Sequence, residues 1–147
     1  PLLAGRAVFA ITPNVDELQA LVGHPLADTV EELAAASATL HARGVEVVWV
    51  SRGRQGSLIV PRGGEACQIP VEPVAAVDVT GAGDAMTAGF VHGLLQGEDL
   101  LSAARLGHRA AALTVASRHT VRPDLATAMA GSVPHVAVST TNEGVTR

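Results

Sequence analysis

A glycine-rich run that leads directly into an apolar helix is the feature that most limits how this chain can fold. Residues 78–91 read DVTGAGDAMTAGFV. The small residues Gly81, Ala82 and Gly83 let backbone N–H groups approach a ligand closely, and the first turn of the following helix adds unpaired N–H groups and the positive end of its dipole. Such a turn favours phosphate as its ligand. The turn also contains a carboxylate, Asp84, which would repel a bound phosphate if it were only a neighbour. Asp84 is therefore better placed to accept a proton from an attacking hydroxyl.

The same run has a purely structural alternative. It is a tight strand-to-helix turn in which Asp84 interacts only with the helix dipole. The helix expected over residues 83–96 is apolar on nearly every side, so it is predicted to be a central, buried helix. Its N-terminus is therefore expected to be held rigidly, whichever role the turn has.

Strand-like and helix-like segments alternate along the chain, which predicts a layered α/β sheet. Strands are expected at residues 7–12, 45–50, 57–60 and 66–69, and helices from about residue 15, between Asp28 and Gly44, and over residues 83–96, 99–117 and 125–130. Asp28 and Glu31 have the spacing of a capping box for the second helix. The run at 45–50 is β-branched and mostly apolar, as expected of a strand with helices on both faces. Two glycines between the last two strands predict a hairpin.

Three loops follow predicted strands and carry most of the polar and glycine-rich sequence. They comprise residues 12–17, 51–56 and 78–84. In layered α/β sheets, ligands bind beyond the carboxyl ends of the strands, which is where all three loops would fall. The sequence therefore predicts one site built from three loops.

Composition and charge exclude several other classes of protein. The net charge is −4 and there is no basic run, which argues against a nucleic-acid partner. All ten basic residues are arginine, which excludes a P-loop lysine and Schiff-base chemistry. No segment approaches the roughly 18 apolar residues that span a bilayer and no signal peptide opens the chain, so we expect no membrane partner and a cytoplasmic location. A dinucleotide-dependent oxidoreductase is disfavoured, because no G-x-G-x-x-G follows an initial strand.

Residues 78–91 also resemble the C-terminal signature of the PfkB (ribokinase-like) family of carbohydrate and nucleoside kinases, with Val79 and Met86 as departures. The resemblance implies a three-layer α/β sandwich with a mainly parallel sheet, as in the C-terminal half of a ribokinase-like fold. Residues 1–147 would then form a single nucleotide-binding and catalytic region, and the upstream half that carries the substrate contacts and lid would be absent. The implied activity is ATP-dependent phosphoryl transfer to a hydroxyl of a sugar or nucleoside.

The resemblance also implies a role for each residue of the glycine-rich run and for two metal sites. Asp84 would be the catalytic base, and the backbone amides of residues 81–84, which include Gly81, Ala82 and Gly83, would stabilise charge on the transferring group. Asn14 and Glu17 resemble the family's N-x-x-E motif, which helps organise magnesium and phosphate, largely through water. Their spacing equally fits a helix capping box, and both roles can coexist. Asp78 and Thr80 lie where many members of the family bind a monovalent cation, usually potassium.

The loop SRGRQG at 51–56 resembles the family's T-x-G-x-x-G loop against the nucleotide. Ser51 replaces the usual threonine and keeps its hydroxyl, and Gly53 and Gly56 match the two glycines. An ordinary strand-to-hairpin turn is the alternative. Arg52 and Arg54 could meet phosphates, but solvated positions are expected for both.

The run GHRAAA at 107–112 resembles the family's A-N-A-A-A run beside adenine, with His108 in place of asparagine. Imidazole can stack on a purine or bond to it, but a lone histidine more often has a structural role. Both readings of His108 remain open.

Two further questions remain open at this point. Residues 113–125 most resemble pseudouridine kinases, but the residues that would discriminate among sugar and nucleoside acceptors are expected upstream. The alternative function is that of a truncated, non-catalytic half that binds nucleotide or serves in assembly. Half a sheet exposes apolar surface and a strand edge, so self-association into a homo-oligomer is also open.

Overall fold

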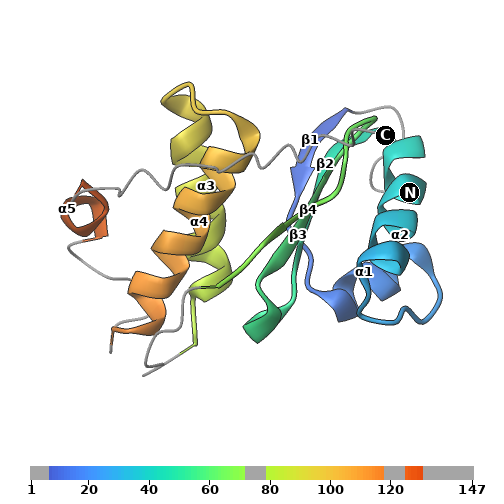
Figure 1. Cartoon of the computed structure of the whole chain (residues 1–147), viewed down its shortest axis with the longest axis horizontal. Coiled ribbons are helices and arrows are strands. Elements are labelled where there is room, and N and C mark those ends of the chain that lie inside the picture. Colours follow the sequence, from blue (N-terminus) through green and yellow to red (C-terminus); the bar gives the residue numbers. More distant parts are fainter. Residues whose placement is uncertain (1–6, 72–78, 118–124, 131–147) are drawn as a thin grey trace, which may run out of the picture.

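The computed structural model describes residues 7–71, 79–117 and 125–130. Its strands and α-helices follow one another in the order that the sequence predicts, with one short 3₁₀ helix in addition (Figure 1). They are β1 (Val8–Ile11), α1 (Val15–Val22), α2 (Val30–Ala42), β2 (Val45–Ser51), the short 3₁₀ helix η1 (Gly53–Gln55), β3 (Ser57–Pro61), β4 (Cys67–Ile69), α3 (Ala82–Leu95), α4 (Leu100–Val115) and α5 (Leu125–Ala130).

The four strands form one sheet in the order β1-β2-β3-β4. β1 runs parallel to β2, which it reaches through α1 and α2, whereas β2 and β3, and then β3 and β4, are antiparallel. The predicted α/β class and the predicted hairpin between the last two strands are therefore confirmed. The described part of the sheet is mixed rather than mainly parallel, because short connections after β2 and β3 return the chain antiparallel.

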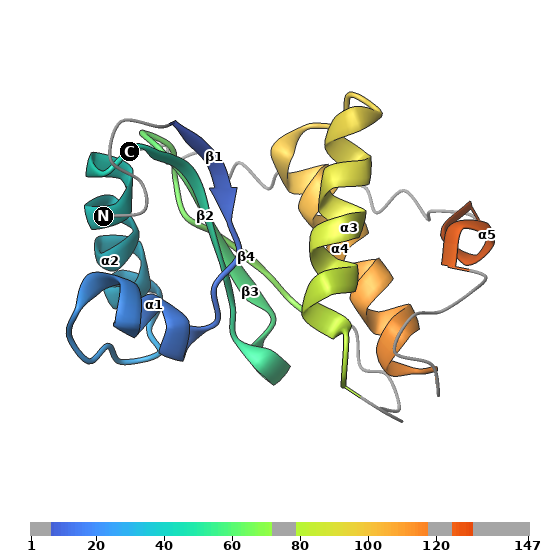
Figure 2. The same ribbon diagram turned by 180° about the vertical axis from the view of Figure 1, so that it is seen from behind.

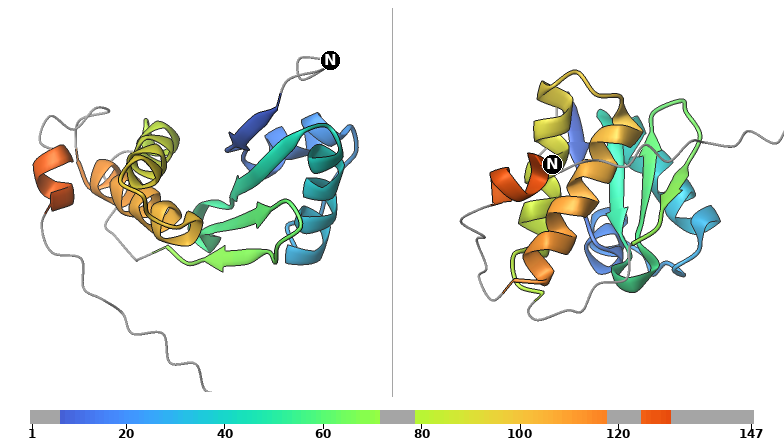
Figure 3. Two further views of the ribbon diagram at one scale, coloured as in Figure 1. Left: turned by 90° about the horizontal axis from the view of Figure 1, so that it is seen from above. Right: turned by 60° about the vertical axis from the view of Figure 1, so that its left-hand side comes forward.

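Helices cover both faces of the sheet and make three layers. α1 and α2 lie on one face and α3 and α4 on the other, as Figures 1 and 2 show from opposite sides. The alternation of side chains along β2 produces this arrangement. Val48 and Val50 pack in the core against α1 and α2, whereas Val47 and Trp49 pack in the core that contains Phe90 of α3. The views in Figure 3 show the curved sheet between its two helical layers.

Small residues let α3 and α4 approach each other closely. A Cβ atom built on Gly107 of α4 would lie 2.5 Å from the carbonyl oxygen of Met86 and 2.5 Å from the ring of Trp49. A Cβ on Gly89 of α3 would lie 2.8 Å from the carbonyl oxygen of Leu106. The helix pair therefore needs glycine at both positions, and its close packing fixes α3 and its N-terminus against the sheet.

The helix starts differ from the sequence predictions in two places. The N-cap of α2 is Thr29, whose side chain accepts from the amide of Glu32, so the predicted cap at Asp28 is wrong by one residue. The carboxylate of Asp28 instead pairs with Arg52. α3 begins at Ala82, one residue earlier than expected, after Gly81 in a left-handed conformation. The predicted cap of α4 at Asp99 is confirmed.

Apolar side chains are exposed near the β1 edge of the sheet. Within the described residues β1 pairs only with β2. Phe9 of β1 is 55% exposed, Leu21 of α1 44%, and Val91 and Leu95 of α3 46% and 80%. None of the helices in the described ranges combines the length and the apolar character needed to cross a bilayer.

Candidate active site

The structure brings the three predicted loops together at one end of the sheet. Asn14 forms an isolated parallel bridge with Ser51, and the Ser51 amide donates to the carbonyl oxygen of Pro13 at 2.9 Å. On the other side, the hydroxyl of Thr12 lies 3.3 Å from that of Thr87 in the second turn of α3. The loop at 12–17 therefore lies between the loop at 51–56 and the start of α3. The described part of the third loop begins at residue 79.

Two backbone amides at the N-terminus of α3 have no main-chain acceptor in the part of the chain that the structure describes. The Ala82 amide donates to Val79 O at 3.2 Å and the Ala85 amide to Gly81 O at 2.9 Å. The intervening amides of Gly83 and Asp84 have no backbone acceptor among the described residues. A Cβ atom on Gly83 would meet nothing within 4 Å, so this residue faces open space on its side-chain side. Two free amides at the positive end of a helix are suited to an anion.

The carboxylate of Asp84 is exposed and accepts no hydrogen bond from the described residues. Asp99 at the start of α4 is an N-cap aspartate and can be compared with Asp84. It accepts from the amides of Leu101 and Ser102, both at 2.9 Å, and the bonds from Ser102 lower the pKa of the Asp99 carboxyl below its ordinary value. Asp84 makes no such capping bond, which disfavours the purely structural reading of this residue.

Asp84 also lines an open hollow of about 690 Å³ next to the β1 edge. The other residues that line it come from the end of β1 and along α3: Thr12, Thr87, Ala88, Val91, His92 and Leu95. The Thr87 hydroxyl donates to Gly83 O at 3.0 Å, so the second turn of α3 supports the geometry of the first. The hollow gives a second molecule room to approach the Asp84 carboxylate.

Asn14 and Glu17 form a complete capping box at the start of α1. The Glu17 amide donates to Asn14 Oδ1 at 2.8 Å, and the Asn14 amide donates to Glu17 Oε2 at 2.9 Å. The structural alternative for this pair is therefore present. Both residues are exposed, and Glu17 Oε1 accepts no hydrogen bond from the described residues. One carboxylate oxygen is thus left for a ligand, so the metal reading stays a hypothesis.

His108 is part of a buried polar chain with Trp49 and Ser57. Trp49 Nε1 donates to Ser57 Oγ at 2.7 Å, and Ser57 Oγ lies 2.6 Å from His108 Nε2. Burial lowers the pKa of His108 below its ordinary value. The neutral ring can then accept the Ser57 proton at Nε2, which leaves the other ring nitrogen protonated. A structural role for His108 is therefore present, and any contact with a ligand would use Nδ1 or the ring face.

The loop at 51–56 is tightly fitted against β4. Gly56 has φ 86°, and a Cβ atom there would lie 2.0 Å from the Ile69 carbonyl oxygen. The expectation that Arg52 is solvated is wrong, since its side chain is only 5% exposed and pairs with Asp28. Arg54 is exposed, as expected. No local sequence signal indicates the Arg52–Asp28 pair, because the partners are 24 residues apart.

The proposed monovalent cation site falls largely outside the described residues. Asp78 lies outside them, and Thr80 is an exposed residue just before Gly81. The described residues contain no group of three histidine, cysteine, aspartate or glutamate side chains that could hold a metal ion. A divalent cation at Glu17 would therefore be completed by water and by ligand phosphates, as magnesium commonly is.

α3 is not the central, buried helix that the sequence predicts, because Val91 and Leu95 on its outer side are exposed. A layered α/β sheet with a turn suited to an anion at the start of a helix is typical of ligand-binding α/β proteins. The particular family follows from comparison with known proteins. The family model described as "pfkB family carbohydrate kinase" matches residues 2–127. The chain therefore belongs to the PfkB family of carbohydrate kinases, and its fold is that of the ribokinase-like kinases.

Similar proteins include several sugar kinases. The chain is 40% identical to 1-phosphofructokinase of Haemophilus influenzae over 89 residues, covering 60% of this chain and 28% of that protein. It is 38% identical to ribokinase of the same organism over 108 residues, covering 74% of this chain and 35% of that protein. The solved structure of Arabidopsis thaliana ribokinase complexed with ribose and ATP superposes with a TM-score of 0.73 at 32% identity, covering 84% of this chain and 41% of that one. The chain thus spans well under half the length of these relatives.

Proposed function

We propose that the protein containing this chain transfers a phosphoryl group from ATP to a hydroxyl of a sugar, with Asp84 as the base. The observation that carries the proposal is that, among the described residues, the Asp84 carboxylate accepts no hydrogen bond and the adjacent amides of Gly83 and Asp84 at the α3 N-terminus have no backbone acceptor. A capping or salt-bridged carboxylate would be unavailable for proton transfer, whereas this one faces an open hollow. Membership of the PfkB family and the similarity to named sugar kinases support the same activity.

In the proposed reaction Asp84 accepts the proton of the acceptor hydroxyl. The amides of Gly83 and Asp84 at the α3 N-terminus stabilise negative charge on the transferring group, and the small residues from Gly81 to Gly83 let that group approach the backbone. Glu17, through Oε1, and Asn14 would hold magnesium, largely through water, and Asp78 with Thr80 would hold a potassium-like cation. Bound magnesium neutralises charge on the phosphates. Ser51, Gly53, Gly56 and His108 would lie along the nucleotide.

The acceptor is proposed to be a small sugar, since the similar proteins include 1-phosphofructokinase and ribokinase. The narrower proposal of pseudouridine rests only on the sequence of residues 113–125, part of which lies outside the described residues. Phosphorylation assays with ribose, fructose phosphates and pseudouridine, run on the chain together with any upstream segment of its protein, decide between these acceptors.

The first test is calorimetric titration of magnesium-ATP into the chain and into its Gly83→Val variant. A Cβ atom on Gly83 would meet nothing within 4 Å, and valine is a better helix former than glycine, so the variant is expected to fold. It should nevertheless lose nucleotide binding, because the valine fills the space in front of the free amides. Retained binding by the variant would refute the anion site.

The second test uses Asp84→Asn, which keeps the shape of the side chain but cannot accept the proton. We expect ATP affinity to change by less than about threefold and turnover to fall by at least about 100-fold, within the range of a general base. Undiminished turnover in an active preparation would refute the base assignment.

A second candidate is the non-catalytic half, and the β1 edge favours it. Phe9, Leu21, Val91 and Leu95 are all exposed around this edge. Within the described residues the outer edge of β1 has no strand partner, and a strand edge flanked by apolar side chains is a surface for another polypeptide. Sedimentation velocity tests the idea: a well-folded monomer at micromolar concentration argues against an assembly surface, and concentration-dependent association supports it.

A further inference from the structure

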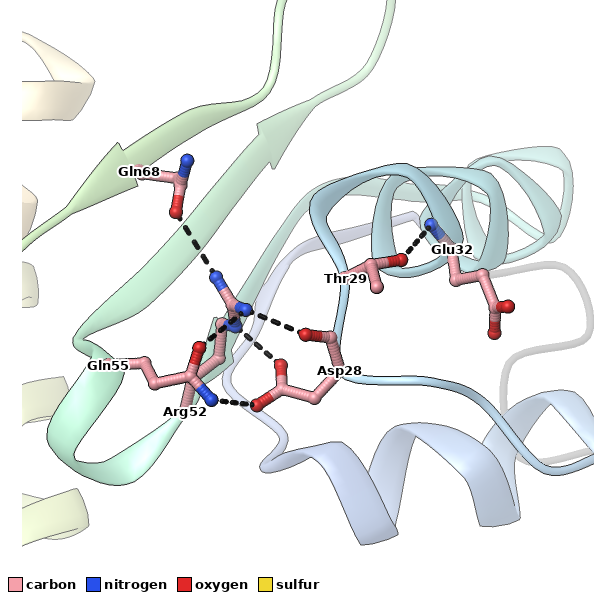
Figure 4. Close-up of polar contacts among 6 residues, drawn as sticks. All are labelled: Asp28, Thr29, Glu32, Arg52, Gln55 and Gln68. Carbon is pink, nitrogen blue, oxygen red and sulfur yellow. Dashed lines mark hydrogen bonds and ion pairs between the residues drawn. The ribbon is translucent and has the colours of Figure 1, made fainter.

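Arg52 carries a charge, yet its side chain is almost completely buried within the loop at 51–56. Figure 4 shows its guanidinium surrounded by acceptors from three residues. Nε donates to Asp28 Oδ1 at 2.5 Å, and Nη2 donates to the Asp28 carbonyl oxygen at 2.9 Å and to Gln55 Oε1 at 3.0 Å. Nη1 donates to Gln68 Oε1 at 3.2 Å. Gln55 Nε2 completes the ring of contacts by donating to Asp28 Oδ2 at 2.7 Å.

These contacts connect three separate parts of the fold. Asp28 precedes α2, and Gln68 lies on β4. Within the loop, Arg52 directly precedes η1 and Gln55 is its last residue. A guanidinium holds its N–H donors in one rigid plane, so these bonds fix direction as well as distance. The loop is therefore held from the α2 side and from the β4 side at once. We call this set of four residues the Arg52 clamp.

The clamp leaves Arg52 with little capacity for a ligand. Four of the five guanidinium N–H donors are directed at protein acceptors. The backbone adds to the constraint, since the Arg52 amide donates to Gly56 O at 2.8 Å. Arg54, two residues away, has the same charge but is exposed and forms no hydrogen bond or ion pair with the described residues. The burial of Arg52 is therefore specific to its position.

We propose that the Arg52 clamp positions the loop at 51–56 for nucleotide binding. Arg52 is a positioning residue in this proposal, because it acts through the loop backbone and not by touching the phosphates. The inference rests on the proposed function, which assigns this loop to the nucleotide. A loop that is already ordered loses little conformational freedom when it binds, so loss of the clamp should weaken nucleotide affinity.

The test compares three variants of the chain with the unsubstituted protein. Arg52→Gln removes the clamp, Arg52→Lys keeps the charge opposite Asp28 but cannot reach Gln55 and Gln68 together, and Arg54→Gln is the matched loss of one exposed charge. Magnesium-ATP affinity is measured by calorimetry, stability by thermal melting, and local order by hydrogen exchange of peptides covering residues 51–57.

We expect Arg52→Gln and Arg52→Lys to weaken magnesium-ATP binding by about tenfold and to accelerate exchange in the loop peptides. Arg52→Lys should melt closer to the unsubstituted protein, because it still neutralises Asp28, while binding remains weak. Arg54→Gln should change affinity by less than about twofold. A purely structural role predicts instead that affinity recovers together with the melting temperature in Arg52→Lys.

The outcomes separate the two hypotheses. If the unsubstituted chain binds magnesium-ATP and Arg52→Lys binds it equally well, the clamp inference is wrong and the proposed function stands. If the folded unsubstituted chain does not bind magnesium-ATP, the nucleotide assignment fails and the inference fails with it. If Arg52→Gln does not fold, the Arg52→Lys variant and Asp28→Asn, which keeps the Asp28 carbonyl contact, decide the question in the same assays.

Discussion

Replacing Ser57 by alanine tests whether the buried chain Trp49–Ser57–His108 stabilises the fold. Ser57 and Trp49 are fully buried, so the indole N–H of Trp49 would have no water to replace the lost acceptor. A buried donor without a partner costs about 1–3 kcal/mol, and the bond lost at His108 adds about 0.5–1.5 kcal/mol. We therefore expect Ser57→Ala to lower the free energy of unfolding by about 1.5–4.5 kcal/mol. At about 3 °C per kcal/mol in a domain of this size, that corresponds to a fall in Tm of about 4–14 °C.

Urea denaturation measures this loss, and fluorescence follows it directly because Trp49 is the single tryptophan. Ser37→Ala is the matched control. Ser37 is equally buried, but its hydroxyl donates to Leu33 O at 2.8 Å, a carbonyl that the helix backbone already satisfies. Its loss should stay below about 1 kcal/mol, since alanine is also the better helix former. If Ser57→Ala were no more destabilising than Ser37→Ala, the reasoning about the unpaired indole donor would be refuted.

Three further predictions concern stability. Gly56→Ala should lower the free energy of unfolding, measured by urea denaturation, by at least about 2 kcal/mol, because φ is positive there and the new Cβ would overlap the Ile69 carbonyl oxygen. Gly53→Ala is the control. Its Cβ would meet nothing within 4 Å, so only the positive φ should count, at about 1 kcal/mol. Burial lowers the pKa of His108 in the folded protein, so the histidine of the unfolded chain is protonated first as the pH falls below about 6.5. The free energy of unfolding should therefore decline below that pH. A His108→Asn variant should show a weaker decline. Asp99→Ala removes the α4 cap and should cost about 1 kcal/mol, read as a lower midpoint of thermal melting.

The sequence predicted the fold well because its signals for secondary structure are local. The β-branched run before Ser51 and the glycines between β3 and β4 specify a strand and a hairpin without reference to distant residues. The cap of α2 was misplaced by one residue, since Asp28 and Thr29 are both good N-cap residues and only the tertiary pairing of Asp28 with Arg52 decides between them.

The candidate site was predictable in its location but less so in its contacts. The ends of the predicted strands and the glycine-rich runs predicted where the three loops lie. The bridge between Asn14 and Ser51 is consistent with the prediction that these loops lie at the same end of the sheet. The burial of Arg52 and the bond from Ser57 to His108 could not be read from the sequence, because their partners are 24 and 51 residues away. Such pairs depend on the packing of elements that are separate in the chain.

The capping box of Asn14 and Glu17 allows its structural and metal-binding roles to be separated by one substitution. Glutamine completes a capping box as glutamate does, so Glu17→Gln should keep the bond to the Asn14 amide and change stability by less than about 0.5 kcal/mol. It removes the charge that Oε1 would offer to magnesium. If the pair organises the metal, the magnesium concentration for half-maximal ATP binding should rise by about tenfold. An unchanged magnesium dependence at unchanged stability would mean that Glu17 serves α1 alone.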